Sequence, residues 1–190
     1  MRARCFAVLV ALLLAPAAGA AQESWLDAPL AGWNQPGQPV TQAPPGNIAL
    51  ADPRCVQLSR PPQTPEDRAV VAAGWTLQGP FTGGWGAVIV QGLTDYDGMC
   101  RPVGYNYFVF VDGAFAGTLA PAPMAARTDG AAQDVRLGFS GDLTATFVRY
   151  APTDPLCCPS GPDVLVRYRI DRTPSGPVVV PDARDAVPAR

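Results

Sequence analysis

Apolar and polar residues alternate along much of the chain with the period of two that is typical of β-strands. In VLVRYRI, residues 164–170, this period places Val166 and Tyr168 on one face, and Arg167 and Arg169 on the other. We therefore expect this strand to be buried on one side only. In YNYFVFV, residues 105–111, both faces are apolar. We expect this second strand to lie in the centre of a sheet that is covered on both sides.

Turn residues between the apolar runs predict antiparallel hairpins. Asp112 and Gly113 separate YNYFVFV from AFAGTL, and this pair suits a tight two-residue turn. A second hairpin is expected between DVRLGF and LTATFVRY, around residues 140–142. WGAVIVQGL, which begins at Trp85, and a shorter run at residues 75–77 bring the expected strands to about six.

One segment, TPEDRAVVAAGW, carries the signals of a short helix. Thr64 is a good N-cap, Pro65 suits the first helical position, and Glu66 and Asp67 favour the positive end of the helix dipole. Gly74 ends the helix. The predicted fold class is therefore α+β, with an antiparallel sheet of about six strands, stapled by disulfides, and this helix packed on one face. An all-β sandwich or barrel with the helix as a lid is the alternative.

Composition divides the chain into parts of different character. Residues 1–20 place positive charges before an apolar run and small residues, which is the order of a secretory signal peptide, and the run is too short to span a bilayer. Residues 21–63 form an arm rich in proline and glycine, and residues 64–172 form a single domain. The proline-rich tail, residues 173–190, is expected to fray.

These parts predict an exported, soluble mature chain, either periplasmic or extracellular, without a transmembrane segment. Trp25, Trp33 and Cys55 lie in the arm, and such apolar residues favour its docking on the domain.

Composition also excludes several kinds of chemistry. The chain has no histidine and a net charge of −2, and its basic residues are all arginine. It therefore has no Ser-His or Cys-His nucleophilic pair, no imidazole metal ligand and no Schiff-base lysine. The scattered charges form no basic surface for nucleic acid or an anionic membrane. We expect no cofactor and no nucleic-acid partner.

Carboxylates are left as the candidate acid and base groups. TDYDG places Asp95 and Asp97 two residues apart, on one face if the segment is extended. The pair has three interpretations: a catalytic pair of the kind that hydrolyses glycosides, a set of calcium ligands, or a surface turn in which Gly98 takes a positive φ. We favour the turn, because the fragment lacks the third ligand and the later glutamate of a calcium loop.

Two other groups of residues are candidate ligand contacts. Arg149, Arg167 and Arg169 lie on neighbouring predicted strands, where they form either an anion-binding patch or a solvated face that discourages edge pairing. Aromatic side chains around the glycine-rich QGPFTGGWG either stack on sugars or, more commonly, pack in the core. They are Trp75, Trp85, Tyr96, Tyr105 and Tyr107.

The cysteines predict a disulfide frame. Cys5 lies in the signal-like segment, which leaves Cys55, Cys100, Cys157 and Cys158 in an oxidising compartment. Neighbouring Cα atoms are about 3.8 Å apart, whereas disulfides usually join Cα atoms about 4.4 to 6.8 Å apart. We therefore expect Cys157 and Cys158 each to pair with Cys55 or Cys100, in one of two connectivities. A four-thiolate zinc site, a redox pair and a vicinal disulfide switch are the alternatives.

Two motifs together resemble those of a known family. FVFVDGAFAGTLAP combines an apolar strand, an Asp-Gly turn and a Gly-Thr strand, and CCPSGPDVLVRYR leads from a cysteine pair into a Val-Arg-Tyr-Arg strand. In this order they resemble the LppP/LprE family of bacterial lipoproteins over residues 75–170. The proteins after which the family is named carry a lipid-attachment cysteine directly after the signal segment, whereas Ala20, Ala21 and Gln22 stand at that position here. Direct lipid anchoring is therefore not expected.

The resemblance implies an extracytoplasmic domain with no assigned reaction, and it carries over no catalytic residue. We expect an exported cell-envelope or secreted protein with a non-enzymatic binding or structural role, whose partner is an envelope component, a small ligand or another protein. The alternatives are a carboxylate-dependent hydrolase that acts on a glycan through Asp95 and Asp97, and a calcium-dependent binding module.

Overall fold

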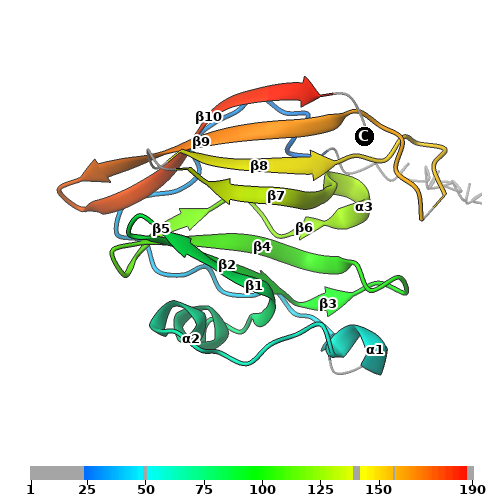
Figure 1. The fold of residues 1–190 in the computed structure, drawn as a ribbon, viewed down its shortest axis with the longest axis horizontal. Coiled ribbons are helices and arrows are strands. Elements are labelled where there is room, and N and C mark those ends of the chain that lie inside the picture. The colour runs from blue at the N-terminus through cyan, green and yellow to red at the C-terminus, as the bar shows by residue number, and fades with distance from the viewer. Residues whose placement is uncertain (1–23, 49–50, 139–141, 156, 188–190) are drawn as a thin grey trace, which may run out of the picture.

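A computed structural model of the chain describes residues 24–48, 51–138, 142–155 and 157–187. Two antiparallel β-sheets lie one above the other, and the helices α1 (Pro53–Val56) and α2 (Pro65–Ala72) lie beyond the first sheet (Figure 1). A third short helix, α3 (Ala126–Asp129), precedes the second sheet. The predicted signal peptide falls outside the described residues.

The first sheet is arranged around its central strand, β4. Its order is β1-β2-β4-β3, and β5 and β6 also pair with β4. The strands are β1 (Thr76–Gly84), β2 (Ala87–Leu93), β3 (Asp95–Tyr96), β4 (Pro102–Val111), β5 (Ala114–Thr118) and β6 (Met124–Ala125).

The second sheet follows the order β10-β9-β8-β7. Its strands are β7 (Ala131–Leu137), β8 (Leu143–Val148), β9 (Asp163–Thr173) and β10 (Gly176–Val187). The chain is thus mainly β. The sequence predicts a single sheet, and this prediction is wrong, because the strands form two sheets. The physical reason is that β8 and β9 each have one apolar face, and these faces pack on the first sheet rather than extend it.

The strand β4 is buried on both faces, as its sequence predicts. Tyr105 and Val109 point into a core that both sheets share, together with Phe147 of β8 and Val166 of β9. The alternate residue Phe108 points the other way, into a second cluster beneath α2. The prediction for β9 is confirmed as well, because Val166 is buried whereas Arg167 and Arg169 are exposed.

The helix α2 is held in place by its N-terminal residues. Thr64 and Asp67 form a capping box, in which the side chain of each accepts a hydrogen bond from the backbone N–H of the other. The buried carboxylate of Asp67 also pairs with Arg60, with an Nη1 to Oδ2 distance of 2.6 Å. Val70 of the helix is fully buried against the first sheet. The helix predicted from TPEDRAVVAAGW is therefore confirmed.

The hairpin turns follow the expected chemistry, with one correction. Asp112 (φ 50°) and Gly113 (φ 79°) form the two-residue turn between β4 and β5. Trp85, which was expected to begin a strand, instead occupies a second such turn with Gly86, at φ 54° and 77°. Its side chain is 61% exposed.

The C-terminal tail was expected to fray, and this prediction is wrong. Residues 176–187 form β10, which pairs with β9 over nearly its whole length. The apolar side chain of Val179 fills the shared core, which stabilises the strand. The prolines are tolerated because β10 is an edge strand, and Pro181 stands where the register with β9 shifts. The arm docks as expected, since Trp25 and Trp33 pack against the same core.

The disulfide connectivity differs from both expected arrangements. Cys55 of α1 pairs with Cys100, with their Cα atoms 4.9 Å apart, and Cys157 pairs with its neighbour Cys158. The expected cross-links do not form because α1 docks beside the loop between β3 and β4, whereas the cysteine pair projects from the loop between β8 and β9 in the other sheet (Figure 1). Spacing alone gave no information about this separation.

Asp67→Asn should lower the free energy of unfolding by about 3 kcal/mol, because it leaves the largely buried guanidinium of Arg60 without its counter-charge. Asp171→Asn is the control: its ion pair with Arg169 is exposed and screened by water, so its loss should cost far less than that of the buried pair. Urea denaturation of both variants measures the difference. Equal losses would mean that the buried pair does not hold α2.

Candidate ligand-binding site

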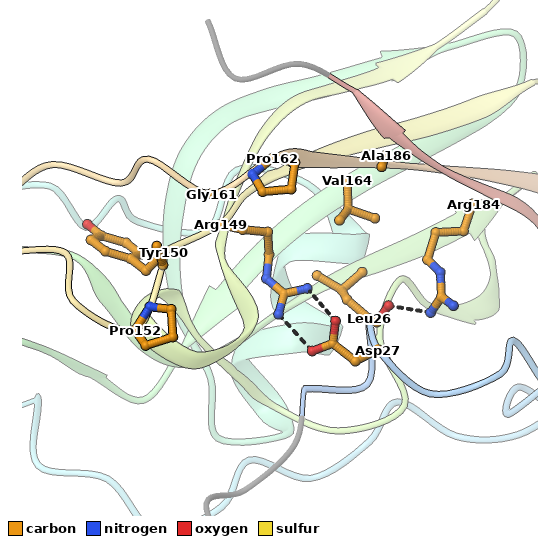
Figure 2. A pocket seen from close by; sticks show the side chains of 11 residues that line it. Leu26, Asp27, Arg149, Tyr150, Pro152, Gly161, Pro162, Val164, Arg184 and Ala186 are labelled. Atoms are coloured by element: carbon orange, nitrogen blue, oxygen red, sulfur yellow. Dashed lines mark hydrogen bonds and ion pairs between the residues drawn. The ribbon is translucent and has the colours of Figure 1, made fainter.

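A cavity of about 470 Å³ opens at one end of the second sheet (Figure 2). The arm, both ends of the loop between β8 and β9, and the last part of β10 meet there. Most of the lining side chains are apolar, as in sites that bind small ligands. The lining residues are Leu26, Asp27, Arg149, Tyr150, Ala151, Pro152, Gly161, Pro162, Val164, Arg184 and Ala186.

The register of β9 and β10 determines which side chains reach the cavity. Val164 pairs with Ala186, and Val166 pairs with Arg184. Paired residues point to the same face of a sheet, and Val166 is fully buried in the core between the sheets. Arg184 and Ala186 therefore lie on the inner face of β10. The cavity therefore lies at the end of the inner face of the second sheet, where the arm covers it.

The arm supplies one wall of this cavity. Leu26 is only 2% exposed, and its neighbour Trp25 packs edge to face on Phe147 of β8, with ring centroids 5.5 Å apart. The carboxylate of Asp27 accepts two hydrogen bonds from Arg149, at 3.2 and 2.8 Å. This bidentate pair fastens the arm to the end of β8 (Figure 2).

The two arginines of the cavity differ in how their charge is balanced. Arg149 and Arg184 lie on either side of Leu26 (Figure 2). Arg149 is paired with Asp27, whereas Arg184 donates from Nη1 to the backbone carbonyls of Leu26 and Ala28. Within the described part of the chain, no carboxylate pairs with Arg184. Its positive charge is thus held at the cavity with no acidic partner from the residues that the structure describes.

The aromatic residue at the cavity, Tyr150, is fixed by two cations. The guanidinium of Arg127 lies 4.6 Å from the centre of its ring, and that of Arg101 lies 5.4 Å away. Arg101 also donates to the phenolic oxygen at 2.6 Å. Because Arg101 lies in the loop that leads into β4 and Tyr150 follows β8, these contacts tie the loop beside the first sheet to the second sheet near the cavity.

Of the two predicted carboxylates, Asp97 has a structural partner. It accepts hydrogen bonds from the backbone of Met99 and from the side chain of Arg101, the latter at 2.6 Å. Burial raises the pKa of Asp97, but the hydrogen bonds from Arg101 and the backbone outweigh it, and the pKa lies below its ordinary value. The segment forms the turn that the sequence favours, although the positive φ falls at Cys100 (58°) and not at Gly98.

The other carboxylate, Asp95, lies in the short strand β3, where its side chain accepts a hydrogen bond from the backbone of Tyr96. Neither Asp95 nor Asp97 lines the cavity.

The three predicted arginines do not come together as one patch. Arg149 lines the cavity and pairs with Asp27. Arg167 and Arg169 lie on the exposed face of β9 and form ion pairs with carboxylates of the same sheet. Arg167 contacts Asp185, and Arg169 contacts both Asp171 and Asp182.

The predicted aromatic cluster divides between the core and the surface. Trp85 is exposed at its turn, whereas the other members are buried: Trp75, Tyr96, Tyr105 and Tyr107. Burial raises the pKa values of Tyr105 and Tyr107 well above the ordinary value. The aromatics therefore give no continuous surface for stacking on sugars.

The described residues contain no cluster of three or more acidic, cysteine or histidine side chains placed to hold a metal ion. The cysteines that would form a thiolate site are instead bonded in two pairs.

Of the described residues that line the cavity, sequence reasoning singled out only Arg149 as a candidate ligand contact, and it missed Leu26, Asp27 and Arg184. Leu26 and Asp27 lie in the arm, and Arg184 lies in the segment that was expected to fray. A signal for Arg184 was present, since the apolar run of residues 178–180 favours a strand that would carry the next residues to the sheet end. The apolar residues of the arm predict that it docks, but local sequence gives no signal for where it docks, because its place depends on tertiary contacts.

The comparison with known proteins concerns the middle of the chain. Residues 85–173, from the turn before β2 to the end of β9, match the model of the LppP/LprE lipoprotein family. This match confirms the resemblance seen in the two motifs, and it indicates an envelope-associated protein. The arm and β10, which supply Leu26 and Arg184 to the cavity, lie outside the matched residues.

No curated protein and no solved structure matches the chain. Among the described residues, no helix is long and apolar enough to cross a membrane.

Asp97→Asn should lower the free energy of unfolding by about 1 to 2 kcal/mol at pH 7, because it weakens the hydrogen bonds that hold Arg101. A carboxylate with a lowered pKa stabilises the fold fully above about pH 4, and this contribution is lost as the pH falls through the lowered pKa. The difference between variant and parent should therefore shrink below about pH 4. Denaturation from neutral to acidic pH measures it, and a difference that stays constant would contradict the ionised pair.

Proposed function

We propose that this LppP/LprE-type protein binds an amphipathic ligand, with an apolar body and an acidic group, in the cavity at the end of the second sheet. The observation that carries the proposal is the combination of apolar walls with the guanidinium of Arg184, which has no carboxylate partner among the described residues. The role is that of an exported binding protein of the cell envelope.

The size and lining of the cavity suit a small ligand. Binding sites for such molecules commonly occupy about 300 to 1,000 Å³ and combine mainly apolar walls with a few polar groups that orient the ligand. Leu26, Val164 and Ala186 supply apolar walls here. A chain of methylene groups placed against these walls leaves water at a gain of about 0.8 kcal/mol per group.

Arg184 gives the site its preference for an acid. Hydrogen bonds between a guanidinium and a carboxylate or phosphate are stronger than those between neutral groups. Nη1 of Arg184 is engaged with two carbonyl groups, so the rest of the guanidinium can receive an anionic ligand group. Arg149 is neutralised by Asp27 and serves to hold the arm wall in place.

The lining favours binding over turnover. Among the described residues that line it, Asp27 is the only carboxylate, and both of its oxygens accept hydrogen bonds from Arg149. A hydrolase that used Asp95 and Asp97 would need Asp97 to leave Arg101 and the backbone groups that it accepts from. The binding role accounts for the cavity without such a rearrangement.

Decanoate should bind to the purified protein more tightly than decanol, which has the same apolar chain and no charge. Arg184→Gln should weaken decanoate binding about tenfold, the effect of about 1.4 kcal/mol of lost charge-assisted hydrogen bonding, and should leave decanol binding unchanged. Isothermal titration calorimetry measures both.

Arg172→Gln is the matched control, because Arg172 pairs with Asp112 on the exposed surface and does not line this cavity. It removes the same charge and should leave both affinities unchanged. The proposal fails if neither probe binds, or if the two variants weaken decanoate equally.

A further inference from the structure

The bonded pair Cys157–Cys158 lies in an exposed loop whose shape is held by other groups. Both cysteines are exposed. Asp154 accepts hydrogen bonds from the backbone N–H groups of Ala151 and Ser160 and from the Ser160 hydroxyl, all at 2.6 to 2.7 Å. These contacts join the two sides of the loop without any part of the disulfide. The loop therefore keeps its anchor whether or not the cysteines are bonded.

The disulfide itself stabilises the fold very little. A cross-link stabilises a protein mainly by restricting the unfolded chain, and the effect grows with the number of residues in the closed loop. Cys55–Cys100 spans 45 positions, so it restricts the unfolded chain strongly. Cys157 and Cys158 are neighbours, so their bond closes almost no chain. Stabilisation of the fold therefore explains the Cys55–Cys100 disulfide but not the Cys157–Cys158 disulfide.

The two bridges also differ in how readily they react. A thiolate has to reach a sulfur atom, and exposed or strained disulfides are the labile ones. The side chain of Cys55 is completely buried, whereas both sulfurs of the neighbouring pair belong to exposed residues. The Cα atoms of the pair are 3.8 Å apart, which is closer than the usual range of about 4.4 to 6.8 Å. The disulfide has to close across this short separation, and its reduction frees the two side chains from each other.

We propose that Cys157–Cys158 is a site of reversible thiol–disulfide exchange, whose reactant is a dithiol. A thiolate of the dithiol attacks one sulfur, the bond between Cys157 and Cys158 breaks, and a mixed disulfide forms. The second thiol of the reactant then releases the protein with both cysteines as thiols. Two electrons and two protons pass from the dithiol to the cysteines, and the dithiol leaves as a disulfide. This exchange is independent of ligand binding in the cavity.

The test is a titration of the native protein with dithiothreitol, followed by alkylation and mass spectrometry of peptides. Cys157 and Cys158 should become alkylated at dithiothreitol concentrations at least tenfold lower than those that open Cys55–Cys100. Removal of the reductant and addition of oxidised glutathione should restore the bond. The melting temperature should change by less than about 2 °C when only the neighbouring pair is reduced.

Two variants complete the test. The double variant Cys157→Ser, Cys158→Ser should fold with an unchanged melting temperature and show no alkylation at low dithiothreitol. The double variant Cys55→Ala, Cys100→Ala should melt at a lower temperature while Cys157 and Cys158 exchange as before. The proposal is overturned if both bridges open together, if the neighbouring pair stays closed until the protein unfolds, or if a non-reduced digest links Cys157 or Cys158 to another cysteine.

Discussion

The burial of β4 on both faces is the constraint on which the other elements depend. One set of its side chains, with Tyr105 and Val109, requires a cover, and the second sheet supplies it. The other set, with Phe108 and Phe110, requires a cover on the opposite side, and α2 supplies that one. A central strand of this kind cannot be stable in a single sheet with one open face, because aromatic side chains would remain in water. The two layers around it therefore follow from its sequence.

The cavity forms at the end of the second sheet, where the arm covers the inner face of β9 and β10. Its walls come from the arm and from β10, which are far apart in the chain, and the contacts of Arg149 and Arg184 with the arm bring them together. Arg149 bonds to a carboxylate and Arg184 to backbone carbonyls, so the two contacts leave different net charges at the site. The site is thus a product of tertiary packing. Its net positive charge arises because Asp27 of the arm neutralises Arg149 and not Arg184.

The sequence predicts the helices and strands whose signals are local. It does not predict features that depend on contacts between distant segments. Apolar runs bounded by turn residues identify β2, β4 and β8, the period of two identifies the buried face of β9, and the capping residues identify α2, because each pattern reflects the element's own geometry. The number of sheets, the pairing of Cys55 with Cys100 and the docking of Leu26 depend on contacts between distant segments. The proline-rich tail was misjudged for a related reason, since proline excludes a central strand but permits an edge strand such as β10.

Residues that look reactive in the sequence have different fates in the fold. Asp97 is committed to Arg101, which in turn holds Tyr150, so its carboxylate has become part of the packing between the sheets. The cysteine pair is the opposite case, because Asp154 and Ser160 hold its loop and leave the disulfide without a structural task. A group whose position is secured by others, and whose bond adds little to stability, is free to change its covalent state while the fold persists. This freedom from a structural role, rather than residue type, makes Cys157–Cys158 a better candidate than Asp97 for a reactive site.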